Sequence, residues 1–262
     1  MFKRIRLSVI FCLVITVAAI FSANIRSLYM VPIIMYHSIT PEATVENRMQ
    51  VSVNSFTRQM RFLKLHHYNV VSLRMVGEMI RDKKKIPPKT VALTFDDGYK
   101  DNYIYAYPTL KQFGLPATMF IIVNEVGRPQ NDRLSWDEIK EMQNSGLIVI
   151  GSHTLDHPYL PEVKSEAELK RQIFDSKKIL EQVLGVPMDL FCYPAGRFNA
   201  QIRDLVIQAG YKFAFVTGLG KKFSNQDIYL IQRVRVAETD NLLDFWIKIS
   251  GYYNSFRSHN NR

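Results

Sequence analysis

Short apolar runs alternate with amphipathic stretches along the chain from about residue 31 onward. Most of these runs are apolar throughout, which is typical of strands that are buried on both faces in a parallel sheet. The candidate strands are residues 33–37, 70–72, 91–95, 117–122, 148–151, 190–193, 212–216 and 234–236. About seven parallel strands with helices between them predict an α/β fold, a distorted (β/α) barrel.

Capping signals mark two of the helices between these strands. Ser135 with Glu138, and Ser165 with Glu168, match the capping-box pattern in which each partner bonds the other's backbone N–H. They predict one helix that ends near residue 144 and a longer one that ends near residue 185.

The first 30 residues differ from the rest of the chain. Basic residues precede an apolar stretch over residues 7–23, whose length is near the lower limit for spanning a bilayer. Residues 1–30 are therefore predicted to be a signal peptide or signal anchor. An uncleaved anchor is favoured, because Phe21 stands where a cut after Ala23 would need a small residue. The positive-inside rule then places residues 31–262, predicted to be one domain, outside the cytoplasm, either membrane-anchored or secreted.

Charge and cysteine content narrow the function classes. The net charge of +10 is spread over short stretches without aromatic interleaving, so no nucleic-acid partner is indicated. A solvated or membrane-adjacent surface, or attraction to anionic envelope polymers, explains this charge as well. The two cysteines, Cys12 and Cys192, are too few for a disulfide framework, and Cys192 is predicted to be a core thiol.

Polar residues gather where several candidate strands end. Because the carboxyl ends of parallel strands meet at one edge, these residues should lie close together. They are His37, the Asp96-Asp97-Gly98 run, His153 and His157, and the Pro194-Ala195-Gly196 run.

Two histidines and a carboxylate form a ligand set for a catalytic metal ion. His153 and His157 can point to one place if their segment forms a helical turn, and an aspartate completes the set. Zinc is the first candidate for this ion, and Fe2+, Ni2+ and Co2+ are the alternatives. Of the adjacent aspartates, one can bind the cation while the other removes a proton from the attacking water. We assign Asp97 to the metal and Asp96 to the base, although spacing alone also allows the reverse.

Three motifs carry a resemblance to a known family. "TFDDG", "SHTLDH" and "FCYPAG", in this order, resemble the first three motifs of the NodB-like polysaccharide deacetylases, carbohydrate esterase family 4. The resemblance covers about residues 31–236 and implies a distorted (β/α) barrel that removes N-acetyl groups from amino sugars with a metal ion. It also implies that Asp96 is the base and that Asp97, His153 and His157 are the metal ligands.

The third motif departs from the family. Cys192 and Ala195 stand where many relatives carry an arginine that steadies the base and an aromatic residue. The backbone N–H of Ala195 can still donate to an oxyanion, since this needs no side chain. Tyr193 and Pro194 are expected to line the substrate pocket, with core packing as an alternative for Tyr193.

A second departure concerns the general acid. The late histidine of the family is missing, and the corresponding neighbourhood reads "LIQRVRV". However, "PIIMYHSIT" resembles the N-terminal stretch of deacetylases that act on poly-β-1,6-N-acetylglucosamine, in which an early histidine supplies the acid. This resemblance implies that His37 protonates the leaving amine, and a structural histidine at the strand end is the alternative.

The sequence thus predicts a metal-dependent hydrolase that removes N-acetyl groups from an extracellular N-acetylglucosamine polysaccharide, with poly-β-1,6-N-acetylglucosamine as the first candidate. One alternative is a peptidoglycan or chitooligosaccharide deacetylase, or an O-acetyl esterase, on the same barrel. Another is a membrane-anchored barrel that binds glycans without turnover. No feature indicates a particular protein partner.

Overall fold

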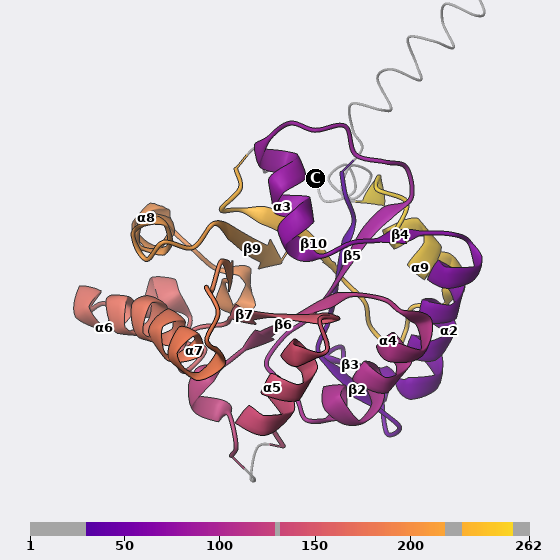
Figure 1. Cartoon of the computed structure of the whole chain (residues 1–262), viewed down its shortest axis with the longest axis horizontal. Helices are drawn as coiled ribbons and strands as arrows, with labels where there is room; N and C mark the ends of the chain where they lie inside the picture. The colour runs from indigo at the N-terminus through magenta and orange to yellow at the C-terminus, as the bar shows by residue number, and fades with distance from the viewer. Residues whose placement is uncertain (1–29, 129–131, 218–226, 254–262) are drawn as a thin grey trace, which may run out of the picture. The chain divides into compact units, whose positions relative to one another are not determined.

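The structure, a computed structural model, describes residues 30–128, 132–217 and 227–253. Its main sheet has eight strands, and the pairing of β1 with both β10 and β5 closes seven of them into a ring. These seven are β1 (Ile33–Tyr36), β5 (Thr90–Phe95), β6 (Ala117–Ile121), β7 (Ile148–Ser152), β8 (Leu190–Cys192), β9 (Phe213–Thr217) and β10 (Ile231–Arg235). The remaining strand, β4 (Asn69–Val70), pairs with β5. All the pairings are parallel, so the predicted parallel barrel is confirmed (Figure 1).

Helices surround the strands in Figure 1. They are α2 (Val53–Leu65), α3 (Leu73–Arg81), α4 (Tyr107–Phe113), α5 (Trp136–Asn144), α6 (Glu166–Lys170), α7 (Ser176–Leu184), α8 (Ala200–Gln208) and α9 (Leu242–Lys248). The two apolar faces of each strand explain this arrangement, because one faces the helices and the other fills the barrel interior.

The barrel interior has its own apolar cluster, which includes Ala92, Phe120 and Phe213. Helix α3 packs onto this cluster through Val76. Gly77 lets the helix approach closely, since a Cβ atom there would lie 2.5 Å from the ring of Phe213.

Of the two predicted capping boxes, the one at Ser135 is confirmed in full and the one at Ser165 in part. Ser135 and Glu138 make both bonds of a capping box at the start of α5. Ser165 caps α6 by accepting from the N–H of Glu168, but the carboxylate of Glu168 binds Arg171 instead. The long helix is also interrupted by a π-helical turn, η5 (Arg171–Asp175).

Three further points concern the predicted elements. Strand β10 begins at Ile231, earlier than the predicted 234, and a small sheet of β2 (Ser38–Thr40) and β3 (Gln50–Ser52) was not predicted. Only the small sheet lies near the carboxyl end of β1, because β2 follows β1 directly along the chain. The predicted signal segment lies outside the described residues, apart from Met30. In the part of the chain that is described, no helix is long and apolar enough to cross a membrane.

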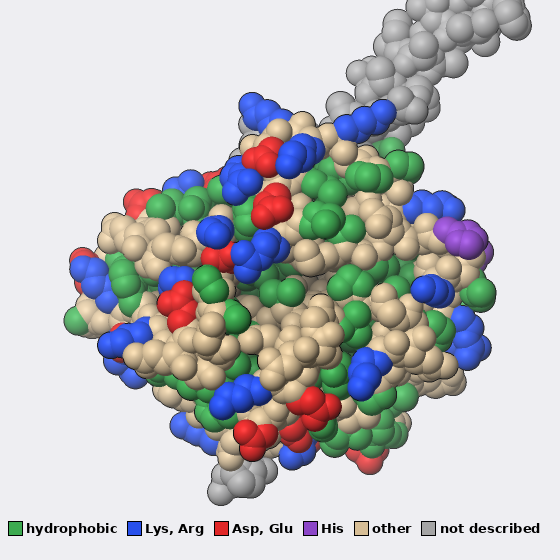
Figure 2. Space-filling view, in the orientation of Figure 1, with side chains coloured by type: hydrophobic (Ala, Val, Ile, Leu, Met, Phe, Trp, Pro, Cys, Tyr) green, Lys and Arg blue, Asp and Glu red, His purple; other side chains and the backbone are tan. Residues whose placement is uncertain are grey.

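Charged side chains are intermixed on the face shown in Figure 2. Lysines and arginines are spread over this face among acidic and apolar side chains, and they are more widespread there than the acidic ones.

Candidate active site

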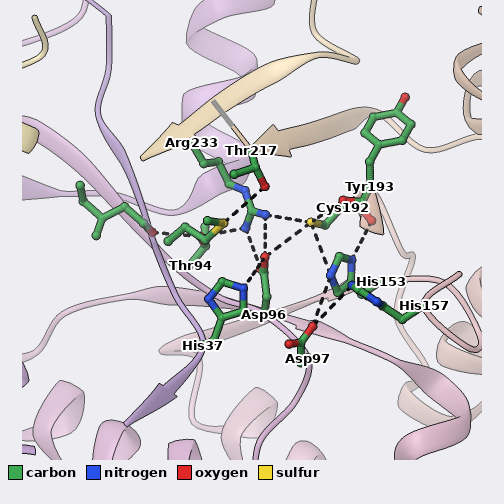
Figure 3. Close-up of polar contacts among 12 residues, drawn as sticks. His37, Thr94, Asp96, Asp97, His153, His157, Cys192, Tyr193, Thr217 and Arg233 are labelled. Carbon is green, nitrogen blue, oxygen red and sulfur yellow. Dashed lines mark hydrogen bonds and ion pairs between the residues drawn. The ribbon is translucent and has the colours of Figure 1, made fainter. Parts of the chain in front are cut away.

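The two adjacent aspartates follow strand β5 and point in different directions. The N–H of Asp96 still bonds the Tyr36 carbonyl at 3.0 Å, which continues the pairing with β1. Asp97 and Gly98 then take left-handed backbone angles, with φ of 70° and 68°. This turn directs Asp96 toward Arg233 and Asp97 toward the histidines (Figure 3). A non-glycine residue in this region is strained, as is common at functional sites.

Arg233 holds the carboxylate of Asp96 from strand β10. Its two terminal nitrogens donate to the two carboxylate oxygens, each at 2.7 Å, and both side chains are buried. One of these nitrogens also donates to the sulfur of Cys192 at 2.9 Å. Burial raises the pKa of Asp96, but the Arg233 guanidinium outweighs it and holds that pKa well below its usual range. Asp96 is therefore ionised and fixed in orientation.

Arg233 is the site residue that the sequence analysis missed. The arginine absent from the third motif, where Cys192 stands, is replaced in space by one from another strand. The signal was a charged residue inside the apolar run "LIQRVRV". It was overlooked because the strand was predicted to begin one residue later, at Val234.

Asp97, His153 and His157 converge on one point. Their ligand atoms all lie within 4.8 Å of one another, and Asp97 Oδ1 is 3.5 Å from His153 Nε2 and 3.8 Å from His157 Nε2. Nδ1–H of His153 donates to the Cys192 carbonyl at 2.8 Å, so the lone pair of its Nε2 faces Asp97. This geometry brings together the three residues predicted as metal ligands.

A divalent cation fits this group. Among the described residues, Asp97 Oδ1 is buried without a hydrogen-bond partner, although it faces two imidazole nitrogens. Burial and the neighbouring Asp96 raise the pKa of Asp97 to about 7. A cation would stabilise the carboxylate and would use the lone pairs of both histidines.

A second group, formed by Asp96, His153 and Cys192, has metal-binding residue types at similar spacing. Arg233 donates to both Asp96 and Cys192, so a positive charge already occupies this place. The group with Asp97 is therefore the better cation site.

The histidine loop reaches this geometry without a helix, so the helical turn considered for it is wrong. Thr154 and His157 have φ of 69° and 56°, which turn the chain back on itself. The hydroxyl of Thr154 accepts from the N–H of His157 at 3.0 Å. Gln172, in the π-helical turn η5, accepts from the N–H groups of Leu155 and Asp156 at 3.2 and 3.0 Å. The loop is thus anchored on both sides of its turn.

His37 lies at the edge of the same group. Its Nε2 is 3.9 Å from Asp96 Oδ2, and only 5% of the residue is exposed. Asn102, in a π-helical turn (η1, Asn102–Ala106), donates to the His37 carbonyl at 2.8 Å. Burial lowers the pKa of His37 to about 4, although the nearby Asp96 opposes this. In the resting protein the imidazole is therefore neutral.

The residues of the third motif differ in burial and in the direction of their side chains. Tyr193 is fully buried, its ring packs against Phe191 and Phe198, and it points away from the histidines (Figure 3). The geometry favours the core-packing alternative for this side chain. Pro194 is buried, whereas Ala195 is exposed and has φ of 51°. Their roles at the substrate stay predictions.

Comparisons with known proteins identify the family. The polysaccharide deacetylase family model matches residues 83–214. The Bacillus subtilis protein YxkH is 34% identical over 79% of this chain and 71% of its own, and a poly-β-1,6-N-acetyl-D-glucosamine N-deacetylase of Staphylococcus aureus is 30% identical over 75% and 71%. Among solved structures, the Streptococcus pyogenes deacetylase PplD has a TM-score of 0.76 at 26% identity, covering 84% of this chain and 97% of its own. IcaB from Ammonifex degensii has a TM-score of 0.73 at 25% identity, covering 86% and 97%. With its barrel and its buried Asp-His group, the chain belongs to the polysaccharide deacetylase family and is a hydrolase.

Proposed function

We propose that this protein removes N-acetyl groups from an N-acetylglucosamine polysaccharide outside the cytoplasm. One observation carries this proposal. The two adjacent carboxylates have different partners. Arg233 binds Asp96, whereas Asp97 faces two imidazole rings. Amide hydrolysis needs both a base and a site for a cation, and this arrangement provides them side by side.

Asp97, His153 and His157 would hold the cation, which is zinc in our proposal. When bound, it supplies a Lewis acid that acidifies water and polarises the acetyl carbonyl. Asp96 accepts a proton from the attacking water, because Arg233 keeps its carboxylate ionised. The N–H of Ala195 donates to the oxyanion.

His37 carries the proton to the departing nitrogen. The resting imidazole is neutral, so it first has to gain a proton. Asp96 is the nearest source, at 3.9 Å, and such contacts commonly shorten when substrate binds. The proton that Asp96 takes from water therefore passes to His37 and then to the nitrogen as the C–N bond breaks. Acetate and a free amine are the products.

Poly-β-1,6-N-acetylglucosamine is the first candidate substrate. The supporting observation is the 30% identity to the Staphylococcus aureus deacetylases named for this polymer. An N-terminal anchor would keep the enzyme beside a polymer of the cell surface. Peptidoglycan, chitooligosaccharides and O-acetyl esters remain the alternatives on the same barrel.

The test is acetate release from N-acetylglucosamine oligomers of defined β-1,6 and β-1,4 linkage and from an O-acetylated glycan, with and without added Zn2+, Ni2+, Co2+ or Fe2+. We expect metal-dependent release, fastest from the β-1,6 oligomer. His153→Ala and Asp97→Asn should lose bound metal and activity while far-ultraviolet circular dichroism is retained. No release from any glycan, with metal bound, would favour the non-catalytic barrel. Release from the ester alone would favour an esterase.

A further inference from the structure

A pocket of about 470 Å³ opens at the carboxyl ends of strands β9 and β10. Its walls include Thr217 at the end of β9, Arg235 at the end of β10, Ile247 on α9 and Arg48 from the loop before β3. A volume of this size is within the range of roughly 300–1,000 Å³ that is usual for ligand sites. Thr217 pairs in register with Arg233, which binds Asp96, so the pocket adjoins the site described above (Figure 3).

Arg235 lies directly above Arg233 at the mouth of the barrel. Side chains two residues apart on a strand share a face, so both arginines of β10 point inward. Arg233 binds Asp96. Arg235 lies at the carboxyl end of the strand and pairs in register with Met35 of β1. Its Nε atom is buried without a hydrogen-bond partner among the described residues. An unpaired buried donor is costly, which points to a missing acceptor.

The acidic residues of the pocket are already engaged. Asp240 pairs with Lys248 and accepts from the N–H of Ala237 at 2.8 Å. Asp244 accepts from the N–H of Asn241 at 3.1 Å, as part of the capping box of α9. Neither of them pairs with an arginine of the pocket.

Arg48, which is exposed, and Arg235, which is partly buried, both line the pocket. Among the described residues, neither side chain makes an ion pair or a hydrogen bond. Burial, followed by the positive charge of Arg48, lowers the pKa of Arg235. Two guanidinium groups that repel each other across a pocket would both be stabilised by an anion between them.

We propose that this arginine pocket, formed by Arg48 and Arg235, binds an acidic substituent of the glycan, a carboxylate or a phosphate, next to the sugar that loses its acetyl group. The inference rests on the proposed function and deepens it, because it adds an acidic substituent beside the reacting sugar to the features that the enzyme would recognise, whatever the linkage of the glycan. Arg235 is close enough to the site for its charge to act on Asp97 and His37. A sugar whose acetamide meets Asp96 and Asp97 would therefore have its neighbouring substituents near Arg235. The guanidinium fork suits either anion, since both offer two oxygens to two N–H groups.

The experiment compares kcat/KM for acetate release from three oligomers. These are a neutral N-acetylglucosamine oligomer, one that alternates with N-acetylmuramic acid and so carries carboxylates, and one that bears phosphate monoesters. We expect at least one acidic oligomer to be preferred by about tenfold or more, the scale of one charge-assisted hydrogen bond. The preferred oligomer identifies the anion.

Variants assign the preference to the pocket. Arg48→Gln and Arg235→Gln should each lower the acidic-to-neutral ratio by about tenfold, mainly through KM, and Arg235→Lys should recover part of it. Arg61→Gln is the matched control. Arg61 is exposed on α2 outside the pocket, and its substitution removes one positive charge, as the two pocket substitutions do. This control should leave the ratio unchanged. Equal ratios in the parent and both glutamine variants, or no acidic preference in the parent, would overturn the inference while leaving the deacetylase function intact.

If no oligomer releases acetate, the proposed function fails, and the pocket is then tested by binding alone. Calorimetric titration with N-acetylmuramic acid, with N-acetylglucosamine 6-phosphate and with N-acetylglucosamine should show tighter binding of an acidic sugar to the parent than to Arg235→Gln. Equal binding of the three sugars would overturn the pocket as well.

Discussion

Arg233 decides the protonation state of Asp96. In a buried site a carboxylate would otherwise gain a proton, because burial disfavours its charged form. The two-pronged contact with Arg233 reverses this tendency and also fixes both carboxylate oxygens. The proposed base is thus kept ionised before any substrate arrives.

Substitution of Arg233 separates this role from simple packing. Arg233→Met leaves the Asp96 carboxylate buried without its cation, so we expect a loss of about 3–5 kcal/mol in the free energy of unfolding, measured with urea. Arg233→Lys keeps the charge but not the two-pronged contact. In this milder variant turnover should fall, and the acidic limb of the pH profile should move to higher pH because burial now raises the pKa of Asp96. An acidic limb at the parent's position would argue against this role.

The proton relay predicts non-additive effects at Asp96 and His37. Each of Asp96→Asn and His37→Ala should lower kcat by roughly a hundredfold or more without changing metal content. The double variant should be no slower than Asp96→Asn alone, because a histidine that receives its proton from Asp96 has nothing to deliver. Multiplied losses would show that His37 obtains its proton elsewhere. On an activated acetyl ester, His37→Ala should be less impaired than on an N-acetylated glycan.

At the scale of elements, the strands that carry the site were predictable because they are apolar throughout. Asp96, Asp97 and both histidines could be predicted from the sequence alone, because they follow the ends of β5 and β7. Strand β10 was harder, since Arg233 interrupts the apolar run and the partner that stabilises its charge is distant in sequence. Pairing across a closed barrel is a tertiary effect that local pattern cannot reveal.

The π-helical turns could not be predicted either. Both support the site, through Asn102 under His37 and Gln172 under the histidine loop. Such turns have no clear sequence signal, and they occur often at functional sites.

Strand β7 offers a test of how packing below the site affects the chemistry. A Cβ atom at Gly151 would lie 2.5 Å from the ring of Phe120, and this ring lies under the guanidinium of Arg233. Gly151→Ala should therefore cost about 1–3 kcal/mol of stability and also lower kcat, because Phe120 is displaced toward Arg233. Ser135→Ala is the control, since it removes a helix cap and costs about 0.5–2 kcal/mol away from the site. Equal kcat in the two variants would show that the packing is not coupled to the site.

For the whole molecule, the proposed metal site should make stability depend on pH and on metal together. In the metal-free protein the folded pKa of Asp97, about 7, is above its value in the unfolded chain. The folded state therefore binds this proton more tightly, and its stability is present below about pH 4 and is lost as pH rises toward 7. A bound cation removes the effect by stabilising the ionised form.

Asp97→Asn tests this linkage. With a chelator present, unfolding by urea should show that the variant gains stability relative to the parent as pH rises from 4 to 7, on the order of 2–4 kcal/mol. The comparison with the variant cancels the opposite trend from the buried histidines. Added Zn2+ should stabilise the parent but hardly the variant. A constant difference between the two proteins across this range would contradict the raised pKa of Asp97.

Cys192 gives the site a spectroscopic reporter of its own. Its thiol is buried, receives a bond from Arg233 and has Asp96 Oδ2 as one of its possible acceptors, at 3.8 Å. The S–H stretching band should therefore rise in frequency when Asp96 gains a proton, because the acceptor loses its charge. Infrared difference spectra of the native enzyme could follow the base through the reaction without any added label.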